Sequence, residues 1–490
     1  MAFVKGGPCE VVGMGTQELV RTMAKEGGGM EPWGLLQVDI SNAFNTVRRG
    51  TILAKLRDTA PAMLPWVRAT LQPAALYCGG SVLRSTRGVQ QGDPLGPLLF
   101  ACAVDAAIRR LPEGCRLHKW YLDDGAMLGP VSLLENALRV LRGALPEVGM
   151  TLNTKKTTVW GPELGPGSAT WTPGEGSALG EVTRLDWVGG TTLLGVPIDA
   201  PRSTTRTKAH LAGVLSKFTD LVSKVGELAD PQCAHSLLRS CLGPGKILYS
   251  LRTCDVSVGE GEFLEKVEAA HRGAFESVVG GAIADAAWNQ ACLPLRLGGC
   301  GLGGVVELAP VARLAAILQF ARGLGTILGK EGEGVEDALL ACPDLLIRLQ
   351  RVLPLDLDPL AGWARAGRVV PESGASGRQK WWADHLAATQ YARLVSGAAG
   401  RDIVRLEAQR VGTGQWMTAP PVSQAGLCMD PTHYRALVKW HLGVPLIRGE
   451  FGGQPCAACR RPVDVFGDHA VMCKRSGLWD RHLGVQTFLC

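Results

Sequence analysis

The chain has 490 residues, with 51 Lys and Arg against 45 Asp and Glu, and hydrophobic residues make up 46% of it. This length suffices for about three domains, and the composition excludes a disordered polar tail or a collagen-like fibre. The 63 Gly and 29 Pro predict many turns, and the net charge of +6 permits a polyanionic partner without requiring one.

The 15 cysteines are scattered at irregular spacing, unlike the framework of a small disulfide-rich secreted domain. We expect most of them to be buried thiols in a reducing compartment. No signal-peptide run follows Met1, and no stretch reaches the ~20 apolar residues of a membrane span. These patterns predict a soluble, intracellular protein without membrane contact.

Strand and helix patterns alternate over the first two hundred residues. A helix is predicted at 11–24, a buried strand at 35–40, and further helices at 50–72, 94–110 and 131–147. Strands are predicted at 82–86, 150–160 and 187–198, a hairpin at 120–128 and a loop at 161–185. This order predicts an α+β fold around an antiparallel sheet.

The pattern becomes helical from about 205 to 325 and again over 336–410, with a Gly-rich linker expected at 329–335. The last block, 443–490, is compact and carries Cys and His. Within the second helical stretch, Lys380-Trp381-Trp382 could stack on bases, although paired Trp in a helix are more often core.

Acidic residues mark two points in the first region. Asp39 closes the buried strand, and Asp123 and Asp124 lie at the tip of the hairpin. If these strands are neighbours, three carboxylates converge at one sheet edge and need a cation to neutralise them. Oxygen ligands suit Mg²⁺ or Mn²⁺, and two ions about 3.5–4 Å apart can clamp a phosphoryl displacement. Taken singly, Asp124-Gly125 is an ordinary hairpin turn, and Asp39 an ordinary strand end.

Two polar segments flank the hairpin in sequence. The Gly- and Pro-rich loop 88–97 lets the backbone approach a flat ligand closely, and Gln91 offers both a donor and an acceptor. The alternative is a plain loop-to-helix junction. The segment 149–157 carries Lys155 and Lys156, which suit a phosphate or simply a solvated loop.

In this order the segments resemble the palm of a reverse transcriptase, most closely those of non-LTR retrotransposons. Val38–Asn45 resembles the first palm motif, Gln91–Pro94 the template-supporting loop, and Tyr121–Asp124 the Tyr/Phe-x-Asp-Asp signature. The resemblance implies that Asp39 and Asp123 bind the catalytic metal ions, with Asp124 as a less directly coordinated neighbour.

The resemblance also implies the nucleotide contacts, which are Ile40, Phe44, Gln91, Gly92 and Lys156. Phe44 would exclude a ribonucleotide's 2′-hydroxyl, and Lys156, in Asn153-x-x-Lys156, would assist the departure of pyrophosphate. Leu194-Gly195-Val196 resembles the start of the primer grip. Gly96 stands where the family often has Ser.

A right-hand polymerase layout follows from the resemblance. It implies partial fingers at 1–34, a palm at 35–200 with a fingers segment near 50–80, a helical thumb at 205–328, a helical connector at 336–442 and a Cys-His zinc-binding block at 443–490. The family's early fingers motifs, which hold the triphosphate, are expected upstream of Gly6. We therefore expect this chain alone to be weak or inactive in primer extension.

The C-terminal block has metal-ligand residue types at knuckle-like spacing, in Cys456-x₂-Cys459-x₉-His469-x₃-Cys473. These four residues predict a closed structural Zn²⁺ site; the alternative is ordinary thiols. We expect Asp468 to support His469, and basic residues around the site to contact phosphate: Arg460, Arg461, Lys474 and Arg475. His482 is a lesser ligand candidate.

The patterns and the resemblance together predict an RNA-directed DNA polymerase that adds deoxynucleotides to a primer 3′-hydroxyl. The expected partners are an RNA template, a DNA primer or target and deoxynucleoside triphosphates, with two Mg²⁺ (or Mn²⁺) ions and one Zn²⁺ as cofactors. Work on chromosomal DNA implies a nuclear location. The alternatives are another reverse-transcriptase lineage, such as an intron maturase or telomerase relative, or a truncated non-catalytic remnant that binds nucleic acid.

Overall fold

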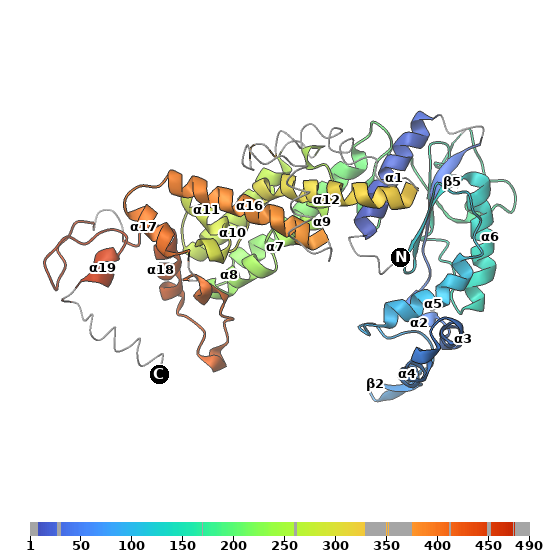
Figure 1. Ribbon diagram of the computed structural model, residues 1–490, viewed down its shortest axis with the longest axis horizontal. Helices are drawn as coiled ribbons and strands as arrows, with labels where there is room; N and C mark the ends of the chain where they lie inside the picture. The colour runs from blue at the N-terminus through green and yellow to red at the C-terminus, as the bar shows by residue number, and fades with distance from the viewer. Residues whose placement is uncertain are drawn as a thin grey trace.

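The computed structural model describes residues 8–26, 31–168, 170–258, 262–328, 349, 351, 375–410, 413–447, 452–473 and 475. The described chain is elongated, with a mixed α/β part at one end, helices in the middle and the Cys/His block at the other end (Figure 1). The α+β composition agrees with the predicted fold class.

A five-stranded sheet organises the α/β part. Its order is β4-β5-β1-β6-β7, formed by Leu117–Tyr121, Asp124–Pro130, Trp33–Val38, Thr158–Trp160 and Thr183–Leu185. The first four strands are antiparallel neighbours, and β7 adds parallel to β6. β1 pairs with β5 along its whole length, from Trp33 opposite Pro130 to Val38 opposite Gly125.

The side chains of β1 point alternately to the two faces of the sheet, and each face packs into a different hydrophobic core. Leu36 and Val38 pack with the helices α3 (Arg49–Thr59), α5 (Gly96–Ile108) and α6 (Val131–Glu147). Trp33 and Leu35 pack with α1 (Pro8–Lys25) and a small hairpin, β8 (Thr191–Leu193) and β9 (Val196–Ile198). Both faces of β1 are therefore covered, which explains why its sequence is a continuous apolar run.

A protruding segment follows β1 and contains α2 (Ala43–Thr46), η1 (Pro61–Met63), α4 (Leu64–Thr70), β2 (Ala74–Cys78) and β3 (Ser81–Ser85). The helix predicted at 50–72 is divided into α3, η1 and α4, because Pro61 and Pro65 each begin a new helical turn. The strand predicted at 82–86 is β3, whereas its partner β2 was not predicted. The β2–β3 hairpin is largely exposed on both faces.

Helices make up the middle of the molecule, and most of them share one core around Phe275 and Trp288. They are α7 (Thr205–Gly226), α8 (Pro231–Ser240), α9 (Leu248–Thr253), α10 (Phe263–Val279), α11 (Asp285–Cys292), α12 (Val305–Leu328), α16 (Ala375–Ser396), α17 (Arg401–Ala408) and α18 (Pro431–Leu442). Asp230 and Asp430 cap α8 and α18 by accepting from backbone N–H groups, each just before a proline at the first helical position.

Short turns complete the chain: η2 (Leu179–Glu181), η3 (Pro244–Lys246), η4 (Val256–Val258), η5 (Leu295–Leu297), η6 (Gln415–Thr418), η7 (Ser423–Ala425) and α19 (Asp468–Met472). The predicted strand 150–160 is wrong over residues 150–157, since only Thr158–Trp160 forms a strand. The expected linker at 329–335 lies outside the described residues. Trp382 is fully buried, so the core interpretation of the tryptophan pair holds for it.

The burial of the cysteines differs from the prediction. All those that the structure describes are free, and only Cys254, Cys292, Cys300 and Cys473 are buried. The rest are half-buried or exposed, so the expectation that most cysteines are buried is wrong. Among the described helices, none combines the length and apolar character needed to cross a membrane.

Candidate active site and metal centre

Strand register brings the acidic residues to one end of the sheet. Val38 lies opposite Gly125, so Asp39, the next residue, follows β1 at the end where Asp124 begins β5. Side chains alternate along a strand, which places Asp39 on the same face as Gln37. Gln37 donates to the hydroxyl of Thr191 in β8 at 2.8 Å. The acidic end of the sheet therefore faces the β8–β9 hairpin.

The turn between β4 and β5 differs from the predicted one. Tyr121 pairs with Asp124, so the two turn residues are Leu122 and Asp123, and Gly125 lies within β5. Leu122 has a φ of 57°, a left-handed conformation that costs a residue with a Cβ about 1–2 kcal/mol. The Asp-Gly turn expected from the sequence is wrong, and this strained turn holds Asp123 at the tip of the hairpin.

The three carboxylates affect one another electrostatically. Partial burial, together with the charge of Asp39, raises the pKa of Asp123. Asp124 reaches solvent, but protein atoms displace part of its water, and with the charges of Asp123 and Asp39 this raises the pKa of Asp124 to about 6. Like charges crowded together favour the binding of a cation. Among the described residues, the three carboxylates do not form a compact group of potential metal ligands of the kind that the Cys/His cluster forms.

Backbone contacts hold Asp39 in place from the segment that follows α6. The N–H of Asp39 donates to the hydroxyl of Thr157 at 3.2 Å, and the carbonyl of Asp39 accepts from the N–H of Asn153 at 2.9 Å. Asn153 also accepts, through its side chain, from the N–H of Lys156 at 3.2 Å. Thr157 is fully buried, and its role cannot be recognised from the sequence because a loop threonine serves many purposes.

The predicted nucleotide contacts lie on segments next to this end of the sheet. Phe44 is half-buried and its ring stacks on Phe100, with 4.5 Å between ring centroids. The loop that carries Gln91 packs against it, since Val89 donates to the carbonyl of Phe44 at 2.8 Å. Gly88 is required there: its φ is 75°, and an added Cβ would lie 2.6 Å from that carbonyl oxygen.

The remaining predicted contacts differ in exposure. Gln91, Gly92 and Lys156 are exposed, as a nucleotide site needs. Ile40 is only 3% exposed and its side chain belongs to the core, so it can offer a ligand its backbone alone.

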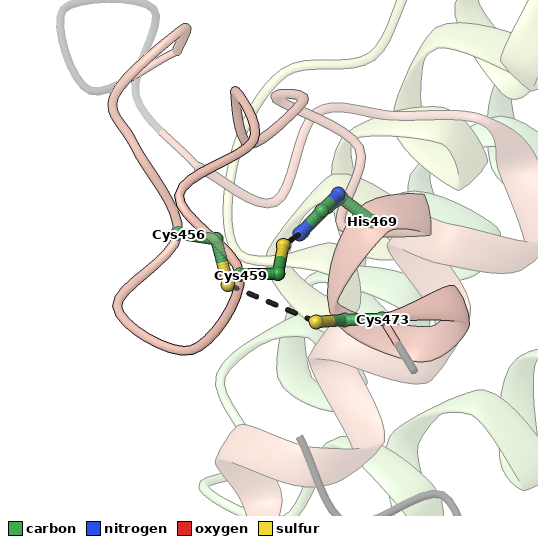
Figure 2. Close-up of side chains that lie close together, drawn as sticks. All are labelled: Cys456, Cys459, His469 and Cys473. Atoms are coloured by element: carbon green, nitrogen blue, oxygen red, sulfur yellow. Dashed lines mark hydrogen bonds between the residues drawn. The ribbon is translucent and has the colours of Figure 1, made fainter. Parts of the chain in front are cut away.

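The Cys/His cluster is gathered by a turn and the short helix α19 (Figure 2). The Sγ atoms of Cys456 and Cys473 are 3.9 Å apart, and the Sγ of Cys459 is 3.2 Å from Nε2 of His469. All four ligand atoms lie within 4.8 Å of one another. Tetrahedral zinc with Zn–S bonds of about 2.3 Å would separate two sulfurs by about 3.8 Å. The cluster therefore fits such an ion.

Electrostatics at the cluster also favour a metal. The backbone N–H groups of Cys459 and Ala458, with His469, lower the pKa of Cys456 to about 6. A thiolate, which is the form that binds metal, is thus stabilised near neutral pH. Asp464 fixes the turn into α19 by accepting from the N–H groups of Phe466, Asp468 and His469.

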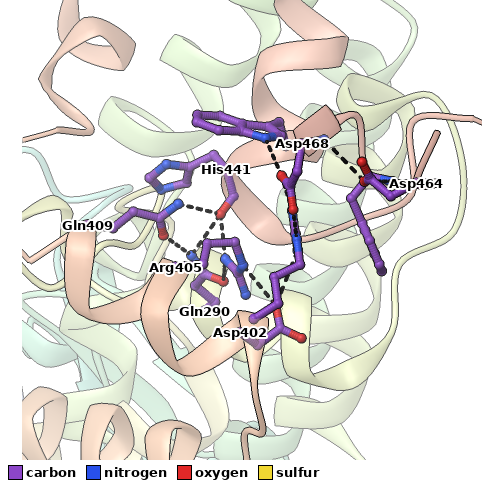
Figure 3. A network of polar contacts seen from close by, with 10 residues as sticks. Gln290, Asp402, Arg405, Gln409, His441, Asp464 and Asp468 are labelled. Atoms are coloured by element: carbon purple, nitrogen blue, oxygen red, sulfur yellow. Dashed lines mark hydrogen bonds and ion pairs between the residues drawn. The ribbon is translucent and has the colours of Figure 1, made fainter. Parts of the chain in front are cut away.

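The expected support of His469 by Asp468 is not found. The Asp468 carboxylate instead pairs with Arg401 of α17 and accepts from Nε1 of Trp440 at 3.1 Å. Figure 3 shows this contact continuing into the helical part. Arg405, also in α17, donates to the side chain of Gln290 at 2.7 Å and to the carbonyl of His441 at 2.6 Å. The Cys/His block is thereby joined to α11 and α18.

The chain also resembles known proteins over the segment that carries the acidic residues. Residues 13–198 match the family model described as "Reverse transcriptase (RNA-dependent DNA polymerase)", a span that includes both acidic segments. A Pol polyprotein from the type-1 retrotransposable element R2 of Nasonia vitripennis is 39% identical over 83 residues, which are 16% of this chain and 8% of that protein. The retrotransposable element SLACS 132 kDa protein of Trypanosoma brucei gambiense is 25% identical over 295 residues, or 58% of this chain and 23% of that protein.

Among solved structures, a Candida albicans telomerase in complex with a fragment of telomeric RNA matches at 12% identity, covering 66% of this chain and 55% of that one. Its TM-score of 0.28 is too low to support a structural argument. The chain spans less than a quarter of the length of the two retrotransposon proteins. The match over both acidic segments and the two relatives confirm the predicted resemblance: residues 13–198 match the reverse transcriptase family model, and both relatives are proteins of retrotransposable elements.

Proposed function

We propose that the chain is an RNA-directed DNA polymerase of a non-LTR retrotransposon. The observation that carries the proposal is the register of β1 and β5, which sets Asp39 beside the hairpin of Asp123 and Asp124. The reverse transcriptase match covers all three residues. In the reaction, the oxygen of a primer 3′-hydroxyl bonds to the α-phosphorus of a deoxynucleoside triphosphate, the bond to pyrophosphate breaks, and the hydroxyl loses its proton.

The three aspartates are the proposed catalytic residues and the proposed holders of two Mg²⁺ or Mn²⁺ ions. Their donor set consists of oxygen alone, which suits these ions, and partial burial together with the neighbouring carboxylate charges raises the pKa values of Asp123 and Asp124. When bound, such ions would favour the alkoxide of the primer and neutralise charge on the departing pyrophosphate.

The surrounding residues are proposed to bind and orient the nucleotide. We propose that the half-buried ring of Phe44, which stacks on Phe100, excludes a 2′-hydroxyl, and that exposed Gln91 and Gly92 offer polar and backbone contacts to the templating base. Ile40 contributes through its backbone. Lys156, exposed and anchored through Asn153 beside Asp39, is proposed to contact the leaving phosphates.

The proposed partners are an RNA template, a DNA primer or target and deoxynucleoside triphosphates, and the proposed location is the nucleus, where target DNA lies. We also propose a division of the chain into domains: partial fingers at 1–34, palm at 35–200, thumb at 205–328, connector at 336–442 and Cys-His block at 443–490.

Zinc is the proposed ion at Cys456, Cys459, His469 and Cys473. The separations fit a tetrahedral site, and a lowered thiol pKa favours it. Arg460 and Arg461 are exposed on the turn between the ligand pairs and suit contacts with phosphate. We propose that the ion stabilises the block structurally, because few apolar side chains are available to stabilise so small a unit.

Primer extension on an RNA template tests the polymerase proposal, using protein in excess so that slow synthesis is detected. Asp123→Asn should abolish extension, whereas Asp105→Asn, a matched change in α5 where Asp105 pairs with Lys55, should not. Binding of Mn²⁺, followed by electron paramagnetic resonance, should weaken in Asp39→Asn independently of activity. Extension that survives Asp123→Asn would overturn the assignment. Primer–template binding without extension by the unaltered protein would favour the non-catalytic remnant.

Elemental analysis of the folded protein tests the zinc proposal. We expect about one zinc ion per chain, and loss of that ion in Cys459→Ser but not in Cys241→Ser, a matched change at an exposed cysteine far from the cluster. A folded protein without zinc, after purification free of chelators, would overturn it.

A further inference from the structure

The turn between β8 and β9 has an unusual conformation for its sequence. Leu193 pairs with Val196, so Leu194 and Gly195 form a two-residue turn with φ values of 49° and 81°. Positive φ at both positions is the type I′ turn, which favours Asn-Gly or Gly-Gly. Leu194 is therefore strained, and such strain persists only where surrounding groups hold it.

One side chain from the helical part holds this turn. Tyr249 of α9 donates its hydroxyl to the carbonyl of Leu194 at 2.6 Å. Its ring also covers Gly195, where an added Cβ would lie 3.2 Å from Cε1 of Tyr249. The turn is thus fixed by a residue 55 positions further along the chain.

The same turn borders the acidic end of the sheet. Leu194, Tyr121 and Asp124 line one small pocket, together with Val12 of α1. Tyr249 packs against the same apolar cluster as Leu194, and burial raises the pKa of its phenol. A shift of the turn would therefore change the space directly beside Asp124.

We propose that Tyr249 is a positioning residue that holds the Leu194–Gly195 turn where the 3′-terminal nucleotide of the primer rests against the acidic site. This inference rests on the proposed polymerase function. It assigns to the helical part of the chain a role in placing the reacting hydroxyl, without any contact between Tyr249 and substrate. The strained turn contacts the terminal nucleotide, and the hydroxyl of Tyr249 fixes the position of the turn next to Asp124.

A purely structural role for Tyr249 is the competing explanation. Tyr434 provides the matched control, because its hydroxyl also makes a buried hydrogen bond, to Nδ1 of His235 at 2.7 Å, inside the helical core. Tyr249→Phe and Tyr434→Phe each remove one hydroxyl while keeping the ring. If only helix stability matters, the two variants should behave alike.

The first experiment measures binding without chemistry. Fluorescence anisotropy compares a primer–template that has a recessed 3′ end with a duplex of equal length whose ends are closed by hairpins. Loss of one hydrogen bond should reduce the preference of Tyr249→Phe for the recessed end about three- to tenfold, while Tyr434→Phe keeps the preference of the unaltered protein.

The second experiment measures steady-state extension. In Tyr249→Phe we expect KM for the primer–template to rise by a similar factor, KM for the deoxynucleotide to stay unchanged, and extension of a primer with a mismatched 3′ end to increase relative to a matched one. Gly195→Ala, which forces the turn away from the Tyr249 ring, should reproduce these changes.

The outcomes separate the two hypotheses. If the unaltered protein extends primers and Asp123→Asn does not, but Tyr249→Phe keeps its recessed-end preference and its KM, the positioning role is wrong and the polymerase function stands. Equal changes in Tyr249→Phe and Tyr434→Phe would also overturn it. If extension is independent of Asp123, the proposed function itself fails.

Discussion

Thr157 accepts a hydrogen bond from the backbone N–H of Asp39 at 3.2 Å, across 118 residues of chain. Asp39 directly follows β1, and Thr157 precedes β6, the neighbouring strand. Because Thr157 is fully buried, no water can replace its hydroxyl if it is removed. The position of a proposed catalytic carboxylate thus depends on a side chain to which the sequence motifs assign no role.

Thr157→Val should therefore weaken catalysis more than it weakens folding. The change keeps the shape but leaves the N–H of Asp39 without its partner, which costs about 1–3 kcal/mol locally. We expect primer extension to slow by about tenfold. Thr157→Ser keeps the hydroxyl and should extend primers much as the unaltered protein does. Equal rates for Val and Ser would show that the contact does not position Asp39.

The junction between α1 and the helical part depends on one buried ion pair. Arg252 of α9 donates from two nitrogens to the two carboxylate oxygens of Glu10, each at 2.7 Å. The two side chains are only 7% and 12% exposed. Arg252 also contacts Gln319 of α12 and Gln379 of α16, so four helices meet at this guanidinium.

Arg252→Met should lower the free energy of unfolding by about 3–5 kcal/mol, because it leaves the charge of Glu10 buried without its partner. Adding Glu10→Gln should restore part of the loss. Urea denaturation measures both. The control is Arg21→Met in α1, the helix of Glu10: Arg21 pairs with Glu18 at 3.6 Å with both side chains about half exposed, and the change should cost under about 1 kcal/mol. Similar losses at the two arginines would contradict the prediction.

Buried histidines should make the helical part sensitive to acid. Burial lowers the pKa values of His235, His271 and His441 to about 4, against about 6.5 in an unfolded chain. Between these values the unfolded state binds more protons, so stability rises with pH there. The contribution of these neutral histidines to the free energy of unfolding is thus fully present above about pH 6.5. It is lost as the pH falls toward 4, by up to about 1.4 kcal/mol per pH unit for each histidine.

Replacing one histidine tests this dependence. His271 packs edge-on against Phe218 and Trp288, so His271→Phe keeps ring packing and removes one titrating group. The variant should lose less stability than the unaltered protein between pH 6.5 and 4.5, measured by urea denaturation at each pH. Parallel pH profiles for the two proteins would show that His271 does not contribute.

The Arg401–Asp468 pair should anchor the Cys/His block without being needed for its metal. Asp468→Asn weakens the contacts with Arg401 and Trp440 but leaves all four proposed ligands in place. We expect zinc content to be unchanged and the block to become more susceptible to limited proteolysis. Cys459→Ser should lose zinc and be cleaved as well. Loss of zinc in Asp468→Asn would mean that Asp468 supports the metal site after all.

Local patterns predicted the elements wherever one physical cause dominated. The amphipathic stretch 131–147 is α6, and the apolar run 35–40 overlaps β1, because burial of apolar side chains decides both. The division at Pro61 was missed because the helical pattern continues across it. The partner strand β2 was missed because hairpin pairing, not burial, makes it a strand: nearly all of its residues are exposed.

For the candidate sites too, local sequence patterns indicate some residues and miss others. Asp39, Asp123 and Asp124 could be proposed from their order and resemblance, as could the four Cys and His residues that the structure brings together. Thr157 and Tyr249 could not be found, because their roles depend on hydrogen bonds to backbone groups of distant segments. Asp468 was assigned to the wrong partner, since adjacency to His469 in sequence says nothing about Arg401, 67 positions away.

The contacts of α1 also bear on how the chain folds during synthesis. The partners of this helix include β9, α9 and α12: an added Cβ at Gly13 would lie 2.4 Å from Val196, and Glu10 binds Arg252. All three partners are synthesised well after α1, so its apolar face stays without them until α12 has left the ribosome. Synthesis that stops before α12 therefore leaves this face exposed to aggregation.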